Sequence, residues 1–200
     1  MESKKFILPK PSFTGKMSVE ECIVRRRSRR RFAENYLSLE EISQLLWAGQ
    51  GITHSNGLRT VPSAGATFPL KTYLLVGAVQ GIGQGLYQYD IEKHGLSLMK
   101  SGDFRVELMS ACWGQTMIGD APVSLIFTAL YERTCNRYGK RGIRYVHMEV
   151  GHVGQNIHLQ AESLALGTVV IGAFDDMKVK AVLGIEDEVP LYIMPVGKRE

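Results

Sequence analysis

The chain has 200 residues, of which 44% are hydrophobic and 22% charged, with a formal net charge of +4. These values fit one folded domain and argue against a disordered, fibrous or membrane class, because no apolar run reaches the ~18 residues of a membrane span. The N-terminal residues 1–5 lack the apolar core of a signal peptide, so we expect a cytoplasmic protein without a membrane partner. The three cysteines are far apart and form no C-x-x-C pair, which predicts free thiols and no metal site.

Residues 1–17 contain two prolines and one glycine and show no apolar periodicity. They predict an extended arm that must dock on another surface, which a partner subunit could supply. We expect residues 18–200 to form a single domain, because no repeat, low-complexity tract or linker interrupts them.

A serine followed three residues later by a glutamate marks two helix starts, at Ser18 and Ser38. In this pattern the two side chains satisfy free amides of the first helical turn. The pattern predicts helices over about 18–26 and 39–48. A loop rich in turn-forming residues then spans about 50–66.

Strands are predicted in the middle of the chain. Residues 72–76 form a short apolar run of strand formers, and residues 85–98 alternate around a turn at 92–95, which predicts a hairpin. A helix over about 103–116 precedes residues 123–131, the strongest strand signal in the chain. We expect that strand to be central to a sheet.

The longest predicted helix spans about 144–166 and carries one apolar stripe, with Gly151 and Gly154 allowing close approach. Such a helix is buried, either in the core or against a second subunit. Its histidines, His147, His152 and His158, are interpreted as helix-face or interface residues, because their spacing does not suit a metal site.

The last third of the chain adds three predicted elements. They are a strand at 168–171, a helix that is capped by Asp175 or Asp176 and ends near Gly184, and a strand at 190–196. Helices and strands mix without a strict βαβ repeat, so an α+β fold is expected.

Six arginines occupy seven consecutive positions, 25–31. Their mutual repulsion costs stability unless an anion compensates, so we expect an anion to bind there. The alternation of Arg26, Ser28 and Arg30 suits one phosphomonoester, gripped by guanidinium forks, better than a long polyanion. A solvated basic face is the alternative, whereas nucleic acid is disfavoured because no aromatic residues are interleaved.

Two glycine-containing segments could present backbone amides to a ligand. Small residues around a proline in 59–66 would let the backbone approach a flat molecule closely. Residues 167–176 turn toward a helix start, where free amides are also exposed. Each segment alone could equally be an ordinary connection.

In this order the segments resemble the nitroreductase superfamily, and within it the short branch of SagB-type dehydrogenases. The most specific part is R-R-S-x-R at 26–30 followed by P-S-A-G-A at 62–66. The resemblance extends over nearly the whole chain from about residue 20, in segments 26–32, 39–46, 47–52, 59–66, 69–70, 170–175 and 195–198. It implies a nitroreductase-like fold, with a central, mostly antiparallel sheet flanked by helices, in an intertwined homodimer.

The resemblance further implies FMN held at the dimer interface. By position, Arg26, Ser28 and Arg30 match the residues that meet its phosphate, its ribityl chain and the N1/O2 edge of its ring, and Arg27 would contribute mainly backbone. A guanidinium near N1/O2 raises the reduction potential of the flavin, because the reduced ring is anionic there. Arg30 is the candidate for that role.

Other positions are carried over from the family in the same way. They match a loop that reaches the flavin from the partner subunit, a segment along flavin N5 and O4, basic residues that close on the phosphate, and a polar residue before the central strand. These are Pro62, Ser63, Ala64 and Gly65; Ile171, Gly172 and Ala173; Lys198 and Arg199; and Gln115. Many long nitroreductases carry a glutamate where Gly172 stands, which puts substrate choice in doubt more than flavin binding.

The implied reaction is ping-pong: NADH or NADPH gives hydride to flavin N5 and leaves, and a nitro compound, quinone or similar acceptor takes its place. One alternative is an azoline dehydrogenase of the SagB type that acts in peptide modification. Another is a flavin-binding or redox-sensing module without turnover. We predict no catalytic residue from the protein itself, because the chain contains no convincing triad.

Overall fold

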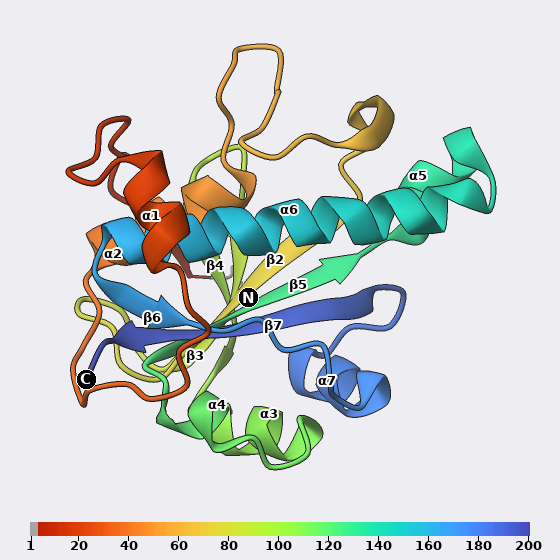
Figure 1. Ribbon diagram of the computed structural model, residues 1–200. Helices are drawn as coiled ribbons and strands as arrows, with labels where there is room; N and C mark the ends of the chain where they lie inside the picture. Colours follow the sequence, from red (N-terminus) through yellow and green to blue (C-terminus); the bar gives the residue numbers. More distant parts are fainter. Residues whose placement is uncertain (1–3) are drawn as a thin grey trace.

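The computed structural model describes residues 4–200 (Figure 1). Seven strands form one sheet in the order β1-β4-β3-β2-β5-β7-β6, and every pair of neighbours is antiparallel. The strands are β1 (Lys5–Ile7), β2 (Leu70–Val76), β3 (Gly85–Asp90), β4 (Gly95–Ser101), β5 (Val123–Ala129), β6 (Leu166–Thr168) and β7 (Val189–Lys198). This confirms the expected α+β class, and β5 lies in the interior of the sheet, between β2 and β7.

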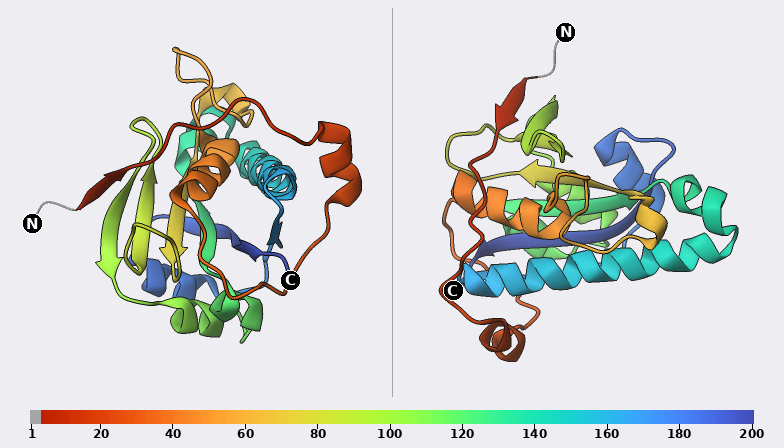
Figure 2. Two further views of the ribbon diagram at one scale, coloured as in Figure 1. Left: turned by 90° about the vertical axis from the view of Figure 1, so that its left-hand side faces the viewer. Right: turned by 90° about the horizontal axis from the view of Figure 1, so that it is seen from above.

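Helices cover both faces of the sheet (Figures 1 and 2). One face packs against α2 (Leu39–Gln50) and α6 (Arg141–Ser163), and the other against α3 (Arg105–Ala111), α4 (Thr116–Asp120) and α7 (Asp176–Leu183). Outside this frame, α1 (Val19–Arg25) lies against α6, α5 (Tyr131–Tyr138) precedes α6, and a short 3₁₀ turn spans Ala64–Ala66.

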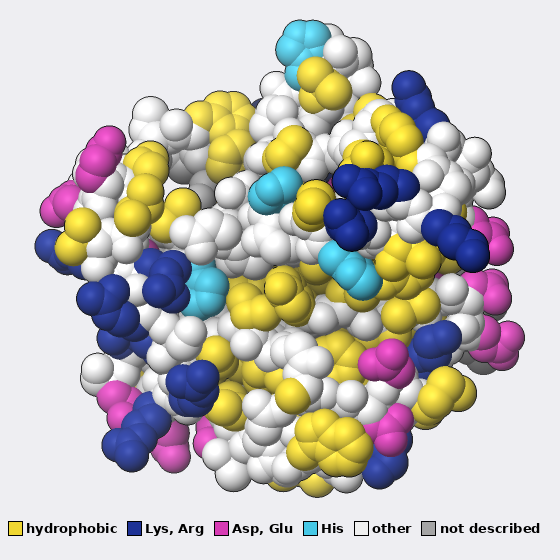
Figure 3. Space-filling view, turned by 45° about the vertical axis from the view of Figure 1, so that its right-hand side comes forward, with side chains coloured by type: hydrophobic (Ala, Val, Ile, Leu, Met, Phe, Trp, Pro, Cys, Tyr) yellow, Lys and Arg dark blue, Asp and Glu magenta, His cyan; other side chains and the backbone are white. Residues whose placement is uncertain are grey.

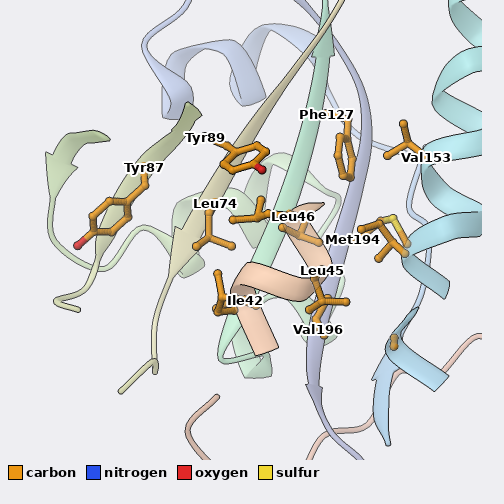
Figure 4. Close-up of a cluster of buried hydrophobic side chains, with 14 of the residues drawn as sticks. Ile42, Leu45, Leu46, Leu74, Tyr87, Tyr89, Phe127, Val153, Met194 and Val196 are labelled. Atoms are coloured by element: carbon orange, nitrogen blue, oxygen red, sulfur yellow. The ribbon is translucent and has the colours of Figure 1, made fainter. Parts of the chain in front are cut away.

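The larger hydrophobic core lies between the sheet and the α2–α6 layer (Figure 4). Ile42 and Leu45 of α2, Leu74 of β2, Phe127 of β5 and Val153 of α6 are all 0–1% exposed. Each such side chain contributes about 1.5–3 kcal/mol relative to an exposed one. Burial of the α6 stripe therefore holds this helix, and the residues on its other faces, in a fixed position.

The predicted helix caps are confirmed. Ser18 and Ser38 each cap their helix in a reciprocal capping box, with Glu21 and Glu41 respectively. In α7 the cap is Asp175, whose side chain accepts a hydrogen bond from the Lys178 amide.

The N-terminal arm docks on its own chain. Lys5–Ile7 pairs with β4, and the backbone of Ser12 exchanges hydrogen bonds with the side chain of Gln44 in α2. The sequence did not predict this strand, because its pairing partner lies about ninety residues away along the chain.

Three other expectations need correction. The strand predicted at 168–171 lies earlier, at Leu166–Thr168, and Ile171 forms only an isolated bridge with Ile193. The helix predicted over 103–116 ends at Ala111 as α3, because Trp113 and Gly114 adopt positive φ values of 58° and 74°, and the separate helix α4 begins at Thr116. The predicted strand 123–131 ends at Ala129, and the unpredicted helix α5 begins at Tyr131.

The described residues also bear on metal and membrane binding. Within residues 4–200, no helix is long and apolar enough to cross a membrane, and no three potential metal-ligating side chains gather together. Cys22 and Cys112 are buried free thiols and Cys135 is a half-buried one.

Candidate functional site

The arginine segment leaves the end of α1 and runs along β6. Ser28 forms a parallel bridge with Thr168, and the Arg29 amide donates to the Thr168 carbonyl at 2.9 Å. Arg26 ends the helix with an extended ψ of 120°, so the basic residues beyond it are not helical. Arg29 is half-buried and faces Glu162 of α6, whereas Ser28 and Arg30 on either side of it are exposed.

The basic residues of this region fall into two groups. Lys198 is ion-paired with Glu41, and Arg199 donates to the carboxylate of Glu162 at 2.5 Å. By contrast, neither Arg26 nor Arg30 has an acidic side chain within 4.0 Å among residues 4–200. Among residues 4–200, Arg26, Arg27, Arg30 and Arg31 of the segment therefore lack an acidic partner, whereas Lys198 and Arg199 are neutralised inside the chain.

Arg27 and Arg29 are held by contacts within the chain. The Arg27 guanidinium folds back onto the carbonyls of Val24 and Arg26, at 3.0 and 2.8 Å, and Nε of Arg29 lies 3.6 Å from Glu162. The Arg27 side chain thus braces the segment, whereas the buried Nε of Arg29 has no hydrogen-bond acceptor among the described residues.

His158 of α6 adds a titratable group near this segment. Burial lowers the pKa of His158, and the positive charge of Arg26 lowers it further, against the opposing effect of Glu162. The imidazole is therefore neutral at pH 7. The sequence identified His158 only as a helix-face or interface residue.

The segment 171–173 begins three residues after β6, the strand along which the arginine segment runs. Ile171 is held by two backbone hydrogen bonds to Ile193 of β7, at 2.8 and 3.0 Å. Gly172 and Ala173 then emerge exposed, and a Cβ on Gly172 would meet only the ring of Tyr192, at 3.9 Å. Gln115 donates to the Ala173 carbonyl at 2.9 Å and so fixes this exposed backbone.

The third predicted group, Pro62 to Gly65, lies elsewhere. It belongs to loop 62–68, which stands over α6 beside α5 (Figure 1), and Ser63 donates to Glu149 of α6 at 2.6 Å. Glu149 and His158 are nine residues apart on α6, a rise of about 13 Å. Within residues 4–200 no hydrogen bond joins this loop to the arginine segment or to 171–173.

Apolar side chains are exposed on the face that carries α6 (Figure 3). Ile143 and Met148 of α6 are 44% and 52% exposed, and Ile23 and Val24 of α1 are 55% and 70% exposed. Ile143 lies at the start of α6, whereas α1 lies against the C-terminal end of that helix, so the exposed apolar side chains are spread along α6 (Figure 1).

Comparison with known proteins gives a consistent picture. Residues 23–198 match the model of the nitroreductase family. A nitroreductase-like protein of Methanocaldococcus jannaschii is 46% identical over 183 residues, which cover 92% of each chain. The crystal structure of a nitroreductase-like protein from Ralstonia eutropha superposes with a TM-score of 0.86 at 30% identity, over 98% of this chain and 90% of that one.

More distant structures share the fold alone. A chain of the E. coli microcin synthetase complex, bound to a truncated precursor, has a TM-score of 0.76 at 22% identity, over 97% of this chain and 78% of that one. The NADPH:FMN oxidoreductase of Vibrio harveyi, in complex with NAD⁺, has a TM-score of 0.65 at 21% identity, over 91% and 69%. The match of 23–198 and the close relatives lead to one conclusion: this chain belongs to the nitroreductase family.

Proposed function

We propose that the protein is an FMN-dependent oxidoreductase that passes hydride from NADH or NADPH to a nitro compound, quinone or similar acceptor, and that it works as a homodimer. The observation that carries the proposal is the uncompensated charge of Arg26 and Arg30, beside Ser28, on a segment braced by the chain's own contacts. Membership of the nitroreductase family supports the oxidoreductase class.

The residues present fit FMN at both ends of that molecule. A phosphate dianion requires a cationic donor and further hydrogen-bond donors, which Arg26 and the Ser28 hydroxyl can supply. A flat ring requires a surface without side-chain bulk: a Cβ on Gly151 of α6 would meet nothing within 4 Å, and Gly172 is nearly as open. We therefore assign the phosphate to the arginine segment and the ring to the surface near Gly172.

When bound, FMN supplies the chemistry of accepting and donating hydride. The chain's part is to bind and orient. Arg30 would place positive charge near the ring edge and favour its anionic reduced state, while Gln115 holds the exposed amides of Gly172 and Ala173 in place. In this proposal Lys198 and Arg199 are not direct ligands of the phosphate, because their side chains are already ion-paired with Glu41 and Glu162.

A homodimer would bring the remaining predicted group into the site. In one chain, loop 62–68 is separate from the arginine segment, yet Pro62 and Gly65 are exposed. Association through the apolar face of α1 and α6 would cover side chains such as Val24 and Met148 and let the partner's loop approach the ring.

Steady-state turnover tests this proposal. Protein loaded with FMN is mixed anaerobically with NADH or NADPH and an excess of menadione or nitrofurazone. Many acceptor molecules reduced per flavin support the proposal. Reduction that stops at one equivalent per flavin contradicts it and favours a module without turnover.

A second candidate function is favoured by the fold shared with the microcin synthetase chain and by a trifolitoxin operon protein of Rhizobium leguminosarum that is 22% identical over 88% of this chain and 54% of its own length. In this candidate the protein oxidises azolines in a modified peptide. Oxidation of a thiazoline-containing peptide by the FMN-loaded protein, faster than reduction of menadione, would favour it.

A further inference from the structure

A buried polar pair lies outside the residues assigned to the phosphate and the ring. Glu149 lies in the middle of α6 and is 3% exposed, and its Oε2 accepts a hydrogen bond from the Ser63 hydroxyl at 2.6 Å. The same hydroxyl oxygen accepts the amide of Phe68 at 3.0 Å. One serine side chain thus joins both ends of loop 62–68 to α6.

The loop needs external support because its backbone is strained. Gly65, Ala66 and Phe68 have φ values of 60°, 52° and 45°, in the left-handed region that residues other than glycine rarely adopt. Residues in this region persist only where their surroundings fix them. From α5, Arg137 donates to the Gly65 carbonyl and Arg133 to the Phe68 carbonyl, each at 3.0 Å.

Glu149 is the support from α6, and its burial is costly. Burial raises the pKa of Glu149 to about 7, although the Ser63 hydrogen bond and the charge of Arg59 act in the opposite direction. Among residues 4–200 it forms no ion pair within 4.0 Å. A buried carboxylate without an ion pair is less favourable than an apolar side chain of similar size, so packing does not explain this residue. Its hydrogen bond to Ser63 does.

The two sides of the loop differ in exposure. Ser63 is half-buried and directed to α6, whereas Pro62, Gly65 and Ala66 are exposed. The exposed side is the one available to a neighbouring subunit. Any change in the hydrogen bond between Ser63 and Glu149 would therefore alter the shape of the surface that the loop presents.

We infer that Glu149 is a positioning residue: through the Ser63 hydroxyl it fixes the backbone of residues 62–66 in the shape that meets the flavin of the partner subunit. The inference rests on the proposed function, in which this loop crosses the dimer interface. Glu149 acts only through Ser63 and takes no part in hydride transfer.

Three variants of the full chain test the inference, Glu149→Ala, Glu149→Gln and Ser63→Ala, with Glu132→Ala as the control. Glu132 is an exposed carboxylate in the first turn of α5. The FMN dissociation constant is measured by quenching of flavin fluorescence, and amide hydrogen exchange over 62–68 is measured without FMN.

Glu149→Ala is expected to raise the dissociation constant at least about tenfold, the usual effect of losing a hydrogen bond to a charged group, and to speed exchange in the loop. Glu149→Gln restores both readouts, because the amide oxygen accepts the same hydrogen bond. Ser63→Ala has at least the effect of Glu149→Ala, because it removes the same contact and also the acceptor of the Phe68 amide. The double alanine variant behaves as Ser63→Ala alone, because the contact to Glu149 is already lost. Glu132→Ala changes neither readout.

Unchanged loop exchange and FMN affinity in Glu149→Ala would overturn the inference, as would fully additive effects in the double variant. If Glu149→Ala does not fold, Ser63→Ala carries the same test. Failure of wild-type protein to bind FMN would reject the proposed function and with it the contact to a flavin. Loop exchange in the FMN-free variants would still decide whether Glu149 fixes the loop.

Discussion

The guanidinium of Arg199 donates to the buried carboxylate of Glu162 at 2.5 Å. The other carboxylate oxygen lies 3.6 Å from Nε of Arg29, and Glu162 is 2% exposed. One acidic residue of α6 therefore holds both the end of the chain beyond β7 and the arginine segment. This arrangement fixes Arg29 while leaving Arg26 and Arg30 without acidic partners among residues 4–200.

Replacing Glu162 by alanine should destabilise the protein. Breaking a fully buried ion pair costs about 3–5 kcal/mol, and we expect about 2 kcal/mol here because both arginines are partly exposed. The urea midpoint of unfolding measures the loss. Glu20→Ala, an exposed change on α1, serves as the control, and an equal shift in both variants would contradict the account.

Arg26→Ala should weaken FMN binding by about 1.5–3 kcal/mol, because it removes a charge-assisted contact with the phosphate. Its neighbour Arg25 is a matched control, since its exposed guanidinium faces Glu21 at 3.6 Å and carries little energy. Titration of apoprotein with FMN compares the two variants. Equal affinity for wild type and Arg26→Ala would show that the phosphate binds elsewhere.

A second buried carboxylate, Glu188, stabilises the sheet. It accepts both Tyr73 and Thr128 as hydrogen-bond donors, and Nζ of Lys71 lies 2.8 Å away. Burial, followed by the negative charge of Glu188, raises the pKa of Tyr73, so the phenol stays protonated and donates. Glu188→Ala should cost about 3 kcal/mol of unfolding free energy. Glu186→Ala, two residues earlier and exposed, should cost less than about 0.5 kcal/mol in the same urea titration.

Glu149 should make stability depend on pH in a defined direction. Its pKa is about 7 in the folded chain, chiefly because of burial, and about 4.3 in an unfolded one. Between these values the folded chain binds the extra proton, so this contribution is fully present below pH of about 4.3 and is lost as pH rises through about 7. The full window corresponds to about 3.7 kcal/mol, of which about 3 kcal/mol falls between pH 4.5 and 7.5.

Glu149→Gln removes this titration. The difference in unfolding free energy between wild type and Glu149→Gln should therefore change by that amount from pH 4.5 to 7.5, with wild type losing relative stability as pH rises. Arg59, the charged neighbour that favours the carboxylate, stays in both proteins. A difference that is constant with pH would show that Glu149 is ionised throughout.

The sequence predicted features that depend on neighbouring residues. The capping boxes at Ser18 and Ser38 are local patterns of four residues, and both form as expected. The buried stripe of α6 follows from helical periodicity in the same way. Features that depend on distant contacts were not predictable: β1 pairs with a strand about ninety residues later, and Trp113 turns the chain where helix propensity would continue it.

In the candidate site, too, only the features set by neighbouring residues could be predicted from the sequence. Arg26, Ser28 and Gly172 were identified from local composition and from the resemblance, whereas the partners that decide the roles of their neighbours lie far along the chain. Arg199 could be matched to a phosphate site in sequence, but its pairing with Glu162 depends on the position of α6. No sequence feature indicated that Glu149 is buried, because a glutamate on a long helix is usually solvated.

The most direct test of the central claim is the visible absorption spectrum of the purified protein, with mass spectrometry of any released cofactor, before and after anaerobic addition of NADH and NADPH. The account predicts a yellow protein that releases FMN and bleaches with at least one of the two nucleotides. A protein that is colourless and takes up no added FMN would contradict it.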